Sequence, residues 1–151
     1  MFRSVLFAAF FFVVQLSHAA PAQVVEVYVP LDAYMDGLQN EGVQELPSLV
    51  VFRARNECLG IIDTGKPDTI GAEFNQISKD GEIKCSVKAS KHFDKTGDAA
   101  TPKAAYHLQL VLLESSICTL CPAYIDEVQK ILDARSDVRA VVVRVTTQSK
   151  K

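Results

Sequence analysis

Two cysteines three residues apart are the residues of this chain whose types and spacing point most directly to chemistry. Cys118 and Cys121 stand in the stretch SSICTLCPAYIDEVQKIL, residues 115–132, where Pro122 follows at once and a run with helical periodicity comes next. Side chains three apart on a helix share one face, so the two sulfurs can reach bonding distance. At a helix N-terminus the backbone N–H groups and the helix dipole favour the thiolate, the reactive form of cysteine. The spacing therefore predicts a pair that undergoes thiol–disulfide exchange.

Two other interpretations of this pair stay open, a static disulfide and half of a zinc site. A structural zinc ion usually takes four ligands in two close pairs, and the remaining cysteines, Cys58 and Cys85, are too scattered to supply the second pair. We therefore expect no metal. Four cysteines allow three pairings, and the local spacing of 118 and 121 leaves Cys58 for Cys85. That second pair would be a structural disulfide on strand-like segments flanking one helix.

The opening residues, MFRSVLFAAFFFVVQLSHAA, have the pattern of a secretory signal peptide. Arg3 precedes an apolar run at 5–16, and small residues at Ser17 and Ala19 predict cleavage after Ala19, which makes residues 1–19 the signal peptide. The apolar run is shorter than the roughly 20 residues of a transmembrane helix, so we expect no membrane span after cleavage. The pattern indicates export to a periplasm, a secretory lumen or the outside, where disulfides persist.

Composition limits the remaining classes of protein. A chain of 151 residues suits one domain, and a hydrophobic fraction of 48% is enough for a core. The formal net charge is −2, with no run of like charges that stands out and no basic patch with interleaved aromatic residues. We therefore expect no binding to nucleic acid.

The elements that must position the cysteines follow from periodicity and from proline and glycine positions. The apolar stretch at 105–116 is typical of a central strand, and with a helix at 118–134 and a strand at 137–147 it predicts a βαβ unit with parallel strands. The rest of the chain predicts two helices and four strands. The helices are expected at 31–42 and 64–81, and the strands at 23–30, 46–54, 58–63 and, as a half-buried edge strand, 82–88.

The unit LVLLESSICTLCPAYIDEVQKIL resembles the thioredoxin superfamily, in which a C-x-x-C opens a helix just after a central strand. A second stretch, EGVQELPSLVVFRARNECLGIIDTGKPDTIGAEFNQI, is similar to the other half of a thioredoxin: a short helix, a proline that opens a strand, a hairpin and a terminal helix. The two halves stand in the reverse of the family's order, so the resemblance implies a circular permutation.

The implied fold is a three-layer α/β domain over residues 20–151, with a mixed central sheet flanked by helices. Residues 23–81 would form the cis-proline half, 89–103 a surface loop, and 104–147 the C-x-x-C half. The strands at 23–30 and 137–147 both fit the position after the redox helix, and the sequence does not decide between them.

The resemblance also implies roles for individual residues. Pro47 would be the cis-proline, preceded by Leu46, and would bind the extended backbone of a substrate beside the redox pair. Cys118 would attack and form a mixed disulfide with a partner protein that presents a thiol or a disulfide, and Cys121 would resolve it. No cofactor is implied. The alternative is a non-enzymatic thioredoxin-like structural or adaptor module of an exported assembly, with both disulfides structural.

Two positions differ from the family's usual pattern. An aromatic residue usually precedes the first cysteine, and Ile117 stands there in this chain. The buried carboxylate that often lies beneath the pair is replaced by Leu112, and Glu114 is the nearest acid, which we interpret as a strand-end residue.

Overall fold

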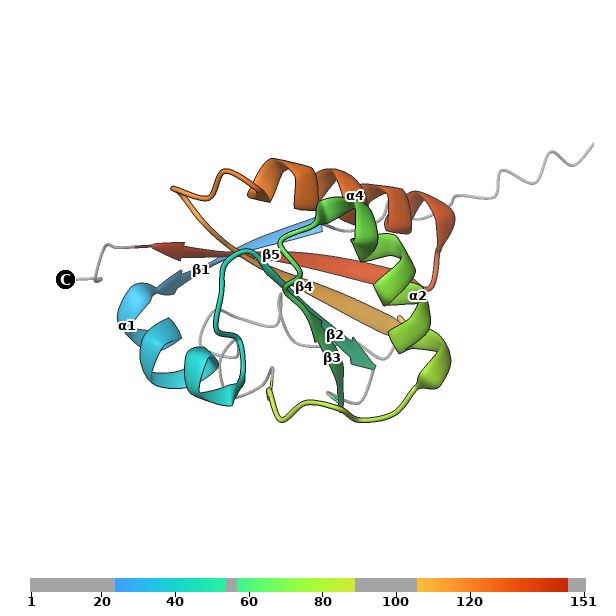
Figure 1. Cartoon of the computed structure of the whole chain (residues 1–151), viewed down its shortest axis with the longest axis horizontal. Helices are drawn as coiled ribbons and strands as arrows, with labels where there is room; N and C mark the ends of the chain where they lie inside the picture. The colour runs from blue at the N-terminus through green and yellow to red at the C-terminus, as the bar shows by residue number, and fades with distance from the viewer. Residues whose placement is uncertain (1–23, 54–56, 89–105, 147–151) are drawn as a thin grey trace, which may run out of the picture.

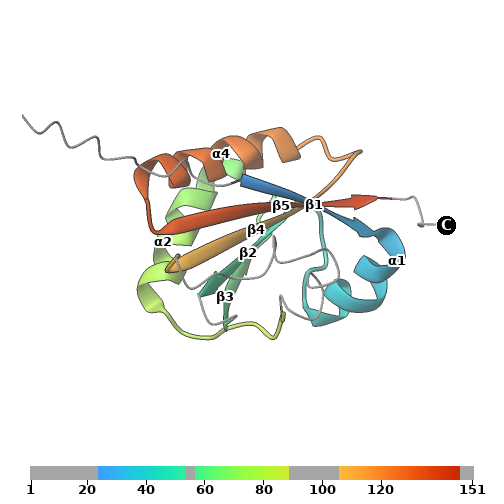
Figure 2. The same ribbon diagram turned by 180° about the vertical axis from the view of Figure 1, so that it is seen from behind.

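The computed structural model describes residues 24–53, 57–88 and 106–146. Over these residues the chain is an α/β protein in which helices flank a mixed five-stranded sheet (Figures 1 and 2). The expected signal peptide at 1–19 and the expected loop at 89–103 lie outside the described residues.

The sheet has the strand order β1-β5-β4-β2-β3. Its first three strands are parallel to one another, β2 is antiparallel to β4, and β3 is antiparallel to β2. The bounds are β1 Val24–Pro30, β5 Val138–Thr146, β4 Leu108–Ser115, β2 Ser48–Arg53 and β3 Glu57–Ile62. The strand that follows the C-x-x-C helix, β5, is therefore the one beside β4, and β1 takes the outer edge.

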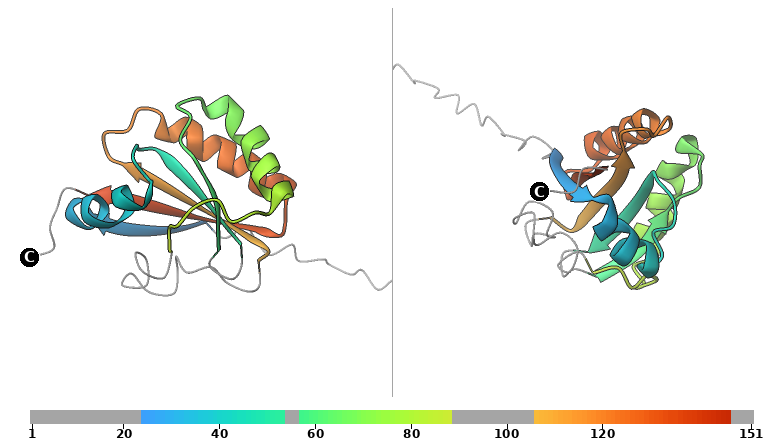
Figure 3. Two further views of the ribbon diagram at one scale, coloured as in Figure 1. Left: turned by 60° about the horizontal axis from the view of Figure 1, so that its bottom comes forward. Right: turned by 90° about the vertical axis from the view of Figure 1, so that its left-hand side faces the viewer.

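The central strand β4 is buried on both faces, as its apolar sequence predicts. Leu110 and Leu112 pack in a cluster with the helices α2 (Ile70–Asp80) and α4 (Cys121–Ala134). These two helices lie next to each other on that face (Figure 3). Val111 and Leu113 alternate to the opposite face, where they belong to a second cluster. The period of two along the strand thus separates two cores, one on each side of the sheet.

Helix α2 begins and ends where proline and glycine predict. A 3-10 turn from Pro67 to Thr69 leads into it, because a proline needs no N–H partner in a first turn. Gly81 closes the helix in the left-handed region at φ 63° and donates its N–H to the carbonyl of Ile77. A residue without Cβ adopts that conformation without steric cost.

The segment after β1 is helical but irregular. Gly37, which weakens the predicted helix, lies inside its π-helical turn, and Gly42 ends the segment at φ 106°. The hydroxyl of Tyr34 donates to the carbonyl of Val43 at 3.0 Å and fixes the segment against the second cluster. The three pieces are α1 (Leu31–Ala33), η1 (Tyr34–Leu38) and η2 (Gln39–Glu41).

The prediction of an edge strand at 82–88 is wrong. This segment runs alongside β3, but the hydrogen bond that joins them is a single one, from the Lys84 N–H to the Cys58 carbonyl at 3.2 Å. Its alternation of exposed and buried residues has another cause, since Cys85 and Val87 pack on the second cluster while Lys84, Ser86 and Lys88 are exposed. An extended segment that covers a core has the same period as a strand, even without a hydrogen-bonded ladder.

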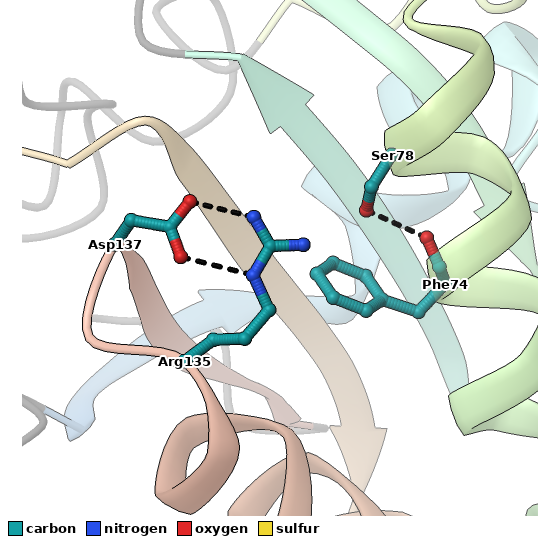
Figure 4. A network of polar contacts seen from close by, with 4 residues as sticks. All are labelled: Phe74, Ser78, Arg135 and Asp137. Carbon is teal, nitrogen blue, oxygen red and sulfur yellow. Dashed lines mark hydrogen bonds and ion pairs between the residues drawn. The ribbon is translucent and has the colours of Figure 1, made fainter.

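The end of α4 is held to α2 and to the entry of β5 by one arginine (Figure 4). The Arg135 guanidinium donates to both carboxylate oxygens of Asp137, at 2.9 and 2.6 Å. The guanidinium also lies 5.5 Å from the centre of the Phe74 ring on α2. The backbone carbonyl of Phe74 accepts a hydrogen bond from the Ser78 hydroxyl. A bidentate pair of this kind fixes orientation as well as charge.

We expect the carboxyl group of Asp137 to titrate below its ordinary pKa of 3.8, because Arg135 hydrogen-bonds the charged form. A pKa below the unfolded value means that the pair stabilises the fold above that pH, and that this contribution is lost as the pH falls through the lowered pKa. The effect on stability should be small, since both side chains are partly exposed.

In Arg135→Met the pKa of Asp137 should rise, which carboxyl carbon NMR titration measures. Arg53→Met removes the cation of the pair with Glu57 instead and should leave Asp137 unchanged. Equal titration of Asp137 in all three proteins would contradict the assignment.

Candidate redox site at the carboxyl ends of the strands

The parallel strands β1, β5 and β4 end at one edge of the sheet, and the antiparallel strand β2 begins at the same edge. Ser115 at the end of β4 is opposite Val145, and Ser48 at the start of β2 is opposite Leu113. The chain that leaves β4 and the chain that enters β2 therefore meet at this edge. In open α/β sheets this is the edge at which binding sites form.

Cys118 and Cys121 are joined by a disulfide, with their Cα atoms 5.5 Å apart. The helix begins at Cys121 and not at Cys118, so the predicted start at 118 is wrong. Pro122 gives the reason, because a helix that included Cys118 would require a proline N–H and would bring the proline ring against the Cys118 carbonyl. Cys118 lies instead in a turn, where its N–H donates to the Ser115 carbonyl at 3.1 Å.

The two sulfurs differ in their access to solvent. Cys121 is 4% exposed and belongs to the buried face of α4, whereas Cys118 is half-buried. A reagent or a partner protein therefore reaches Cys118 first. Unequal access of this kind is what an exchange pair needs, with one sulfur to meet the partner and one protected behind it.

A hollow with a volume of about 430 Å³ opens beside Cys118. The loop from β4 to α4 forms one side, and the segment that leads into β2 forms another. Most of the side chains around it are apolar or uncharged. They are Tyr34, Gln44, Leu46, Pro47, Ser115, Ile117, Cys118, Thr119 and Leu120.

The structure brings Leu46 and Pro47 to the same hollow as Cys118. The peptide bond between Leu46 and Pro47 is cis. Pro47 is buried and Leu46 is half-buried. The bend that contains them is closed by Ser48, whose hydroxyl donates to the Glu45 carbonyl at 2.5 Å.

Sequence reasoning missed the environment of Glu114. This residue is at the strand end, as expected, but it is only 5% exposed and forms an ion pair with Arg144 of β5 at 3.0 Å. It continues the series of Leu110 and Leu112 on the face that α4 covers. The signal was present in the sequence as an acid in phase with buried leucines, with an arginine at the matching position of the next strand.

Cys58 and Cys85 form the second disulfide, with Cα atoms 5.2 Å apart. They belong to the cluster on the other face of the sheet and do not line the hollow. Over the part of the chain that the structure describes, no three His, Cys, Asp or Glu residues are grouped so that they could hold a metal ion. Within the same ranges, none of the helices has the length and apolarity to cross a bilayer.

Fold and site together define an α/β protein in which a C-x-x-C disulfide and a cis-proline line one hollow. Comparison of the chain with protein-family models, with curated proteins and with solved structures gives no match. Its function is therefore inferred from its own residues.

Proposed function

We propose that this protein is an exported thiol–disulfide oxidoreductase built on a circularly permuted thioredoxin-like domain. The observation that carries the proposal is the hollow that Cys118 shares with Leu46 and Pro47, which come from different halves of the chain. Neither a lone disulfide nor a lone proline would point to exchange chemistry. Their meeting at the carboxyl edge of the sheet does, because it sets an attackable sulfur beside a surface for a substrate backbone.

The order of the elements supports the permuted domain. The C-x-x-C helix α4 connects two parallel neighbours, β4 and β5, while the hairpin of β2 and β3 lies antiparallel on the other side of β4. Helix α2 follows the hairpin and packs beside α4. This strand order supports the proposal, because a thioredoxin-like domain with its two halves exchanged in sequence would have the same arrangement. Strand β1 adds a parallel edge and leads through the segment 31–41 to Pro47.

The exchange reaction assigns a role to each sulfur. In the reduced protein the Cys118 thiolate attacks a substrate disulfide, a sulfur–sulfur bond forms between them, and one substrate sulfur leaves as a thiolate. The Cys121 thiolate then attacks the Cys118 sulfur, and the second substrate sulfur leaves. Two electrons pass from the protein to the substrate, and the protons of the two cysteine thiols go to the two substrate thiolates. The same steps in reverse oxidise a dithiol.

The wall formed by Leu46 and Pro47 would hold the substrate while this occurs. Leu46 is half-buried and borders the hollow together with Cys118. An extended substrate segment lying along it would bring its own sulfur to the accessible cysteine rather than to Cys121, which is buried. The proposed substrate is therefore a protein chain in an extended conformation, and no cofactor takes part.

The reduction potential of the 118–121 pair tests the proposal. An exchange pair should equilibrate with thiol buffers at a potential above about −300 mV, whereas structural disulfides fall below that value. The measurement equilibrates the native protein in glutathione or dithiothreitol buffers and quantifies alkylated Cys118 and Cys121 by mass spectrometry. A value below about −300 mV would overturn the proposal and favour the non-enzymatic module with two structural disulfides.

A further inference from the structure

One wall of the hollow beside Cys118 belongs to a segment whose charges are all negative. Residues 31–52 contain four acids, Asp32, Asp36, Glu41 and Glu45, and no lysine, arginine or histidine. This segment contributes Tyr34, Gln44, Leu46 and Pro47 to the lining. The acids Asp36 and Glu45 are exposed. Glu45 stands between the lining residues Gln44 and Leu46, and Asp36 is two residues after Tyr34 in the same helical turn.

The negative charge of Glu45 reaches the hollow itself. Tyr34 lines the hollow, and its hydroxyl donates to the Val43 carbonyl at 3.0 Å. Burial raises the pKa of Tyr34 above its ordinary value, and the nearby charge of Glu45 raises it further. A group inside the hollow therefore experiences the field of this carboxylate.

The other wall is apolar and carries no charge. Residues 115–120, SSICTL, contain no ionisable side chain apart from Cys118. Ile117 is 89% exposed and Leu120 is 39% exposed, an unusual degree of exposure for a large aliphatic side chain beside a reactive sulfur. At the same edge, Arg144 is neutralised by its ion pair with Glu114. An apolar residue that docks against Ile117 would remove both from water, which favours binding.

We propose that the substrate of this site is a cationic cysteine-bearing segment, with an apolar residue beside the cysteine and lysine or arginine residues flanking it. This rests on the proposed function and specifies its substrate class. The apolar residue would cover Ile117, while the basic residues would lie along the segment 31–52 toward its exposed acids Asp36 and Glu45. Complementary charge of this kind accelerates encounter and selects among partners. Basic neighbours also lower the pKa of a substrate cysteine and so raise its thiolate fraction.

A reduced substrate reacts with the oxidised protein in two steps. One substrate thiolate attacks the Cys118 sulfur, the bond between Cys118 and Cys121 breaks, and Cys121 leaves as a thiolate. The second substrate thiolate attacks the substrate sulfur of this mixed disulfide, which releases the Cys118 thiolate. The substrate dithiol is oxidised and the protein disulfide is reduced by two electrons, and the two substrate protons go to Cys118 and Cys121.

Two synthetic dithiol peptides test the preference. They share two cysteines and a neighbouring leucine, and differ only in carrying four lysines or four glutamates. The rate of reduction of the 118–121 disulfide is followed by acid quenching, alkylation and mass spectrometry, and each rate is divided by the rate of the same peptide with glutathione disulfide. We expect the lysine peptide to react about tenfold faster at low salt. The ratio should shrink at about 0.5 M salt, where charges are screened.

Matched variants locate the source of the preference. Asp36→Asn with Glu45→Gln should slow the lysine peptide by about threefold to tenfold and bring its rate close to that of the glutamate peptide. Glu82→Gln with Asp133→Asn removes the same charge elsewhere, since Glu82 follows α2 and Asp133 is near the far end of α4, and should leave the rate unchanged.

The outcomes separate this inference from the proposed function. Exchange at equal normalised rates with both peptides, or a faster glutamate peptide, would overturn the cationic preference and leave the oxidoreductase intact. An equal loss of rate in both double variants would overturn it as well, because the effect would then be one of net charge. If neither peptide reduces the disulfide, the proposed function itself fails and the substrate class falls with it.

Discussion

Replacing Cys118 with serine is expected to abolish thiol–disulfide exchange, and replacing Cys121 with serine to trap a mixed disulfide with the substrate. Cys118 is the sulfur that a partner can reach, since it is half-buried beside the hollow, while Cys121 is 4% exposed. Cys118→Ser should lower the exchange rate by at least about a hundredfold, because covalent exchange has no route without the attacking sulfur. Cys121→Ser should still form the mixed disulfide at Cys118, but it has no thiol with which to resolve it. Non-reducing electrophoresis with mass spectrometry of the adduct measures both effects.

A conservative change at the same loop provides the control. Thr119→Ser alters a residue between the two cysteines, also at the hollow, and should preserve exchange. Circular dichroism on all three variants separates loss of chemistry from loss of fold. If Cys118→Ser accumulated the adduct and Cys121→Ser did not, the roles of the two sulfurs would be reversed.

Much of the fold could be predicted because its signals are local. The both-face burial of β4 follows from a continuous apolar run, and α2 ends at Gly81 as the sequence predicts. The hairpin of β2 and β3 follows from two short β-rich runs. Each of these features depends on residues close together in the chain.

The features that could not be predicted depend on distant parts of the chain. The sequences of β1 and β5 are equally β-branched, and only pairing across the sheet decides that β5 lies beside β4. The segment 82–88 has a strand's period, but Val87 is buried by packing and not by a ladder. Local periodicity does not distinguish these two causes of burial.

The candidate site also has features that the sequence predicts and features that it does not. The spacing of Cys118 and Cys121 predicts their pairing, and the resemblance to thioredoxins predicts that Leu46 and Pro47 lie beside them. The phase of Glu114 with the buried leucines is visible in the sequence, but its ion pair with the half-exposed Arg144 joins two strands that are separated by a helix, so the spacing within either strand does not reveal the partner. The net charge of −2 does not reveal the acidic segment 31–52, because positive and negative charges almost cancel over the whole chain.

The second disulfide should account for a large part of the stability of the fold. It closes a loop of 27 residues between Cys58 and Cys85, and its removal releases that constraint on the unfolded chain. The loop-closure estimate for this length is about 3.5 kcal/mol. Cys58→Ala with Cys85→Ala is therefore expected to lower the free energy of unfolding by about 3 to 4 kcal/mol. Urea unfolding of the oxidised proteins, followed by circular dichroism, measures the difference.

The 118–121 pair is the matched control, because it closes a loop with a sequence separation of only 3. Cys118→Ser with Cys121→Ser should cost about 2 kcal/mol less than loss of the longer loop, since the closure entropy grows with the logarithm of loop length. An equal decrease in the free energy of unfolding in the two double variants would show that chain entropy does not set the contribution of each disulfide to stability. A larger loss from the 118–121 pair would make that disulfide the main structural bond, which contradicts its proposed role as an exchange pair that opens and closes in each cycle.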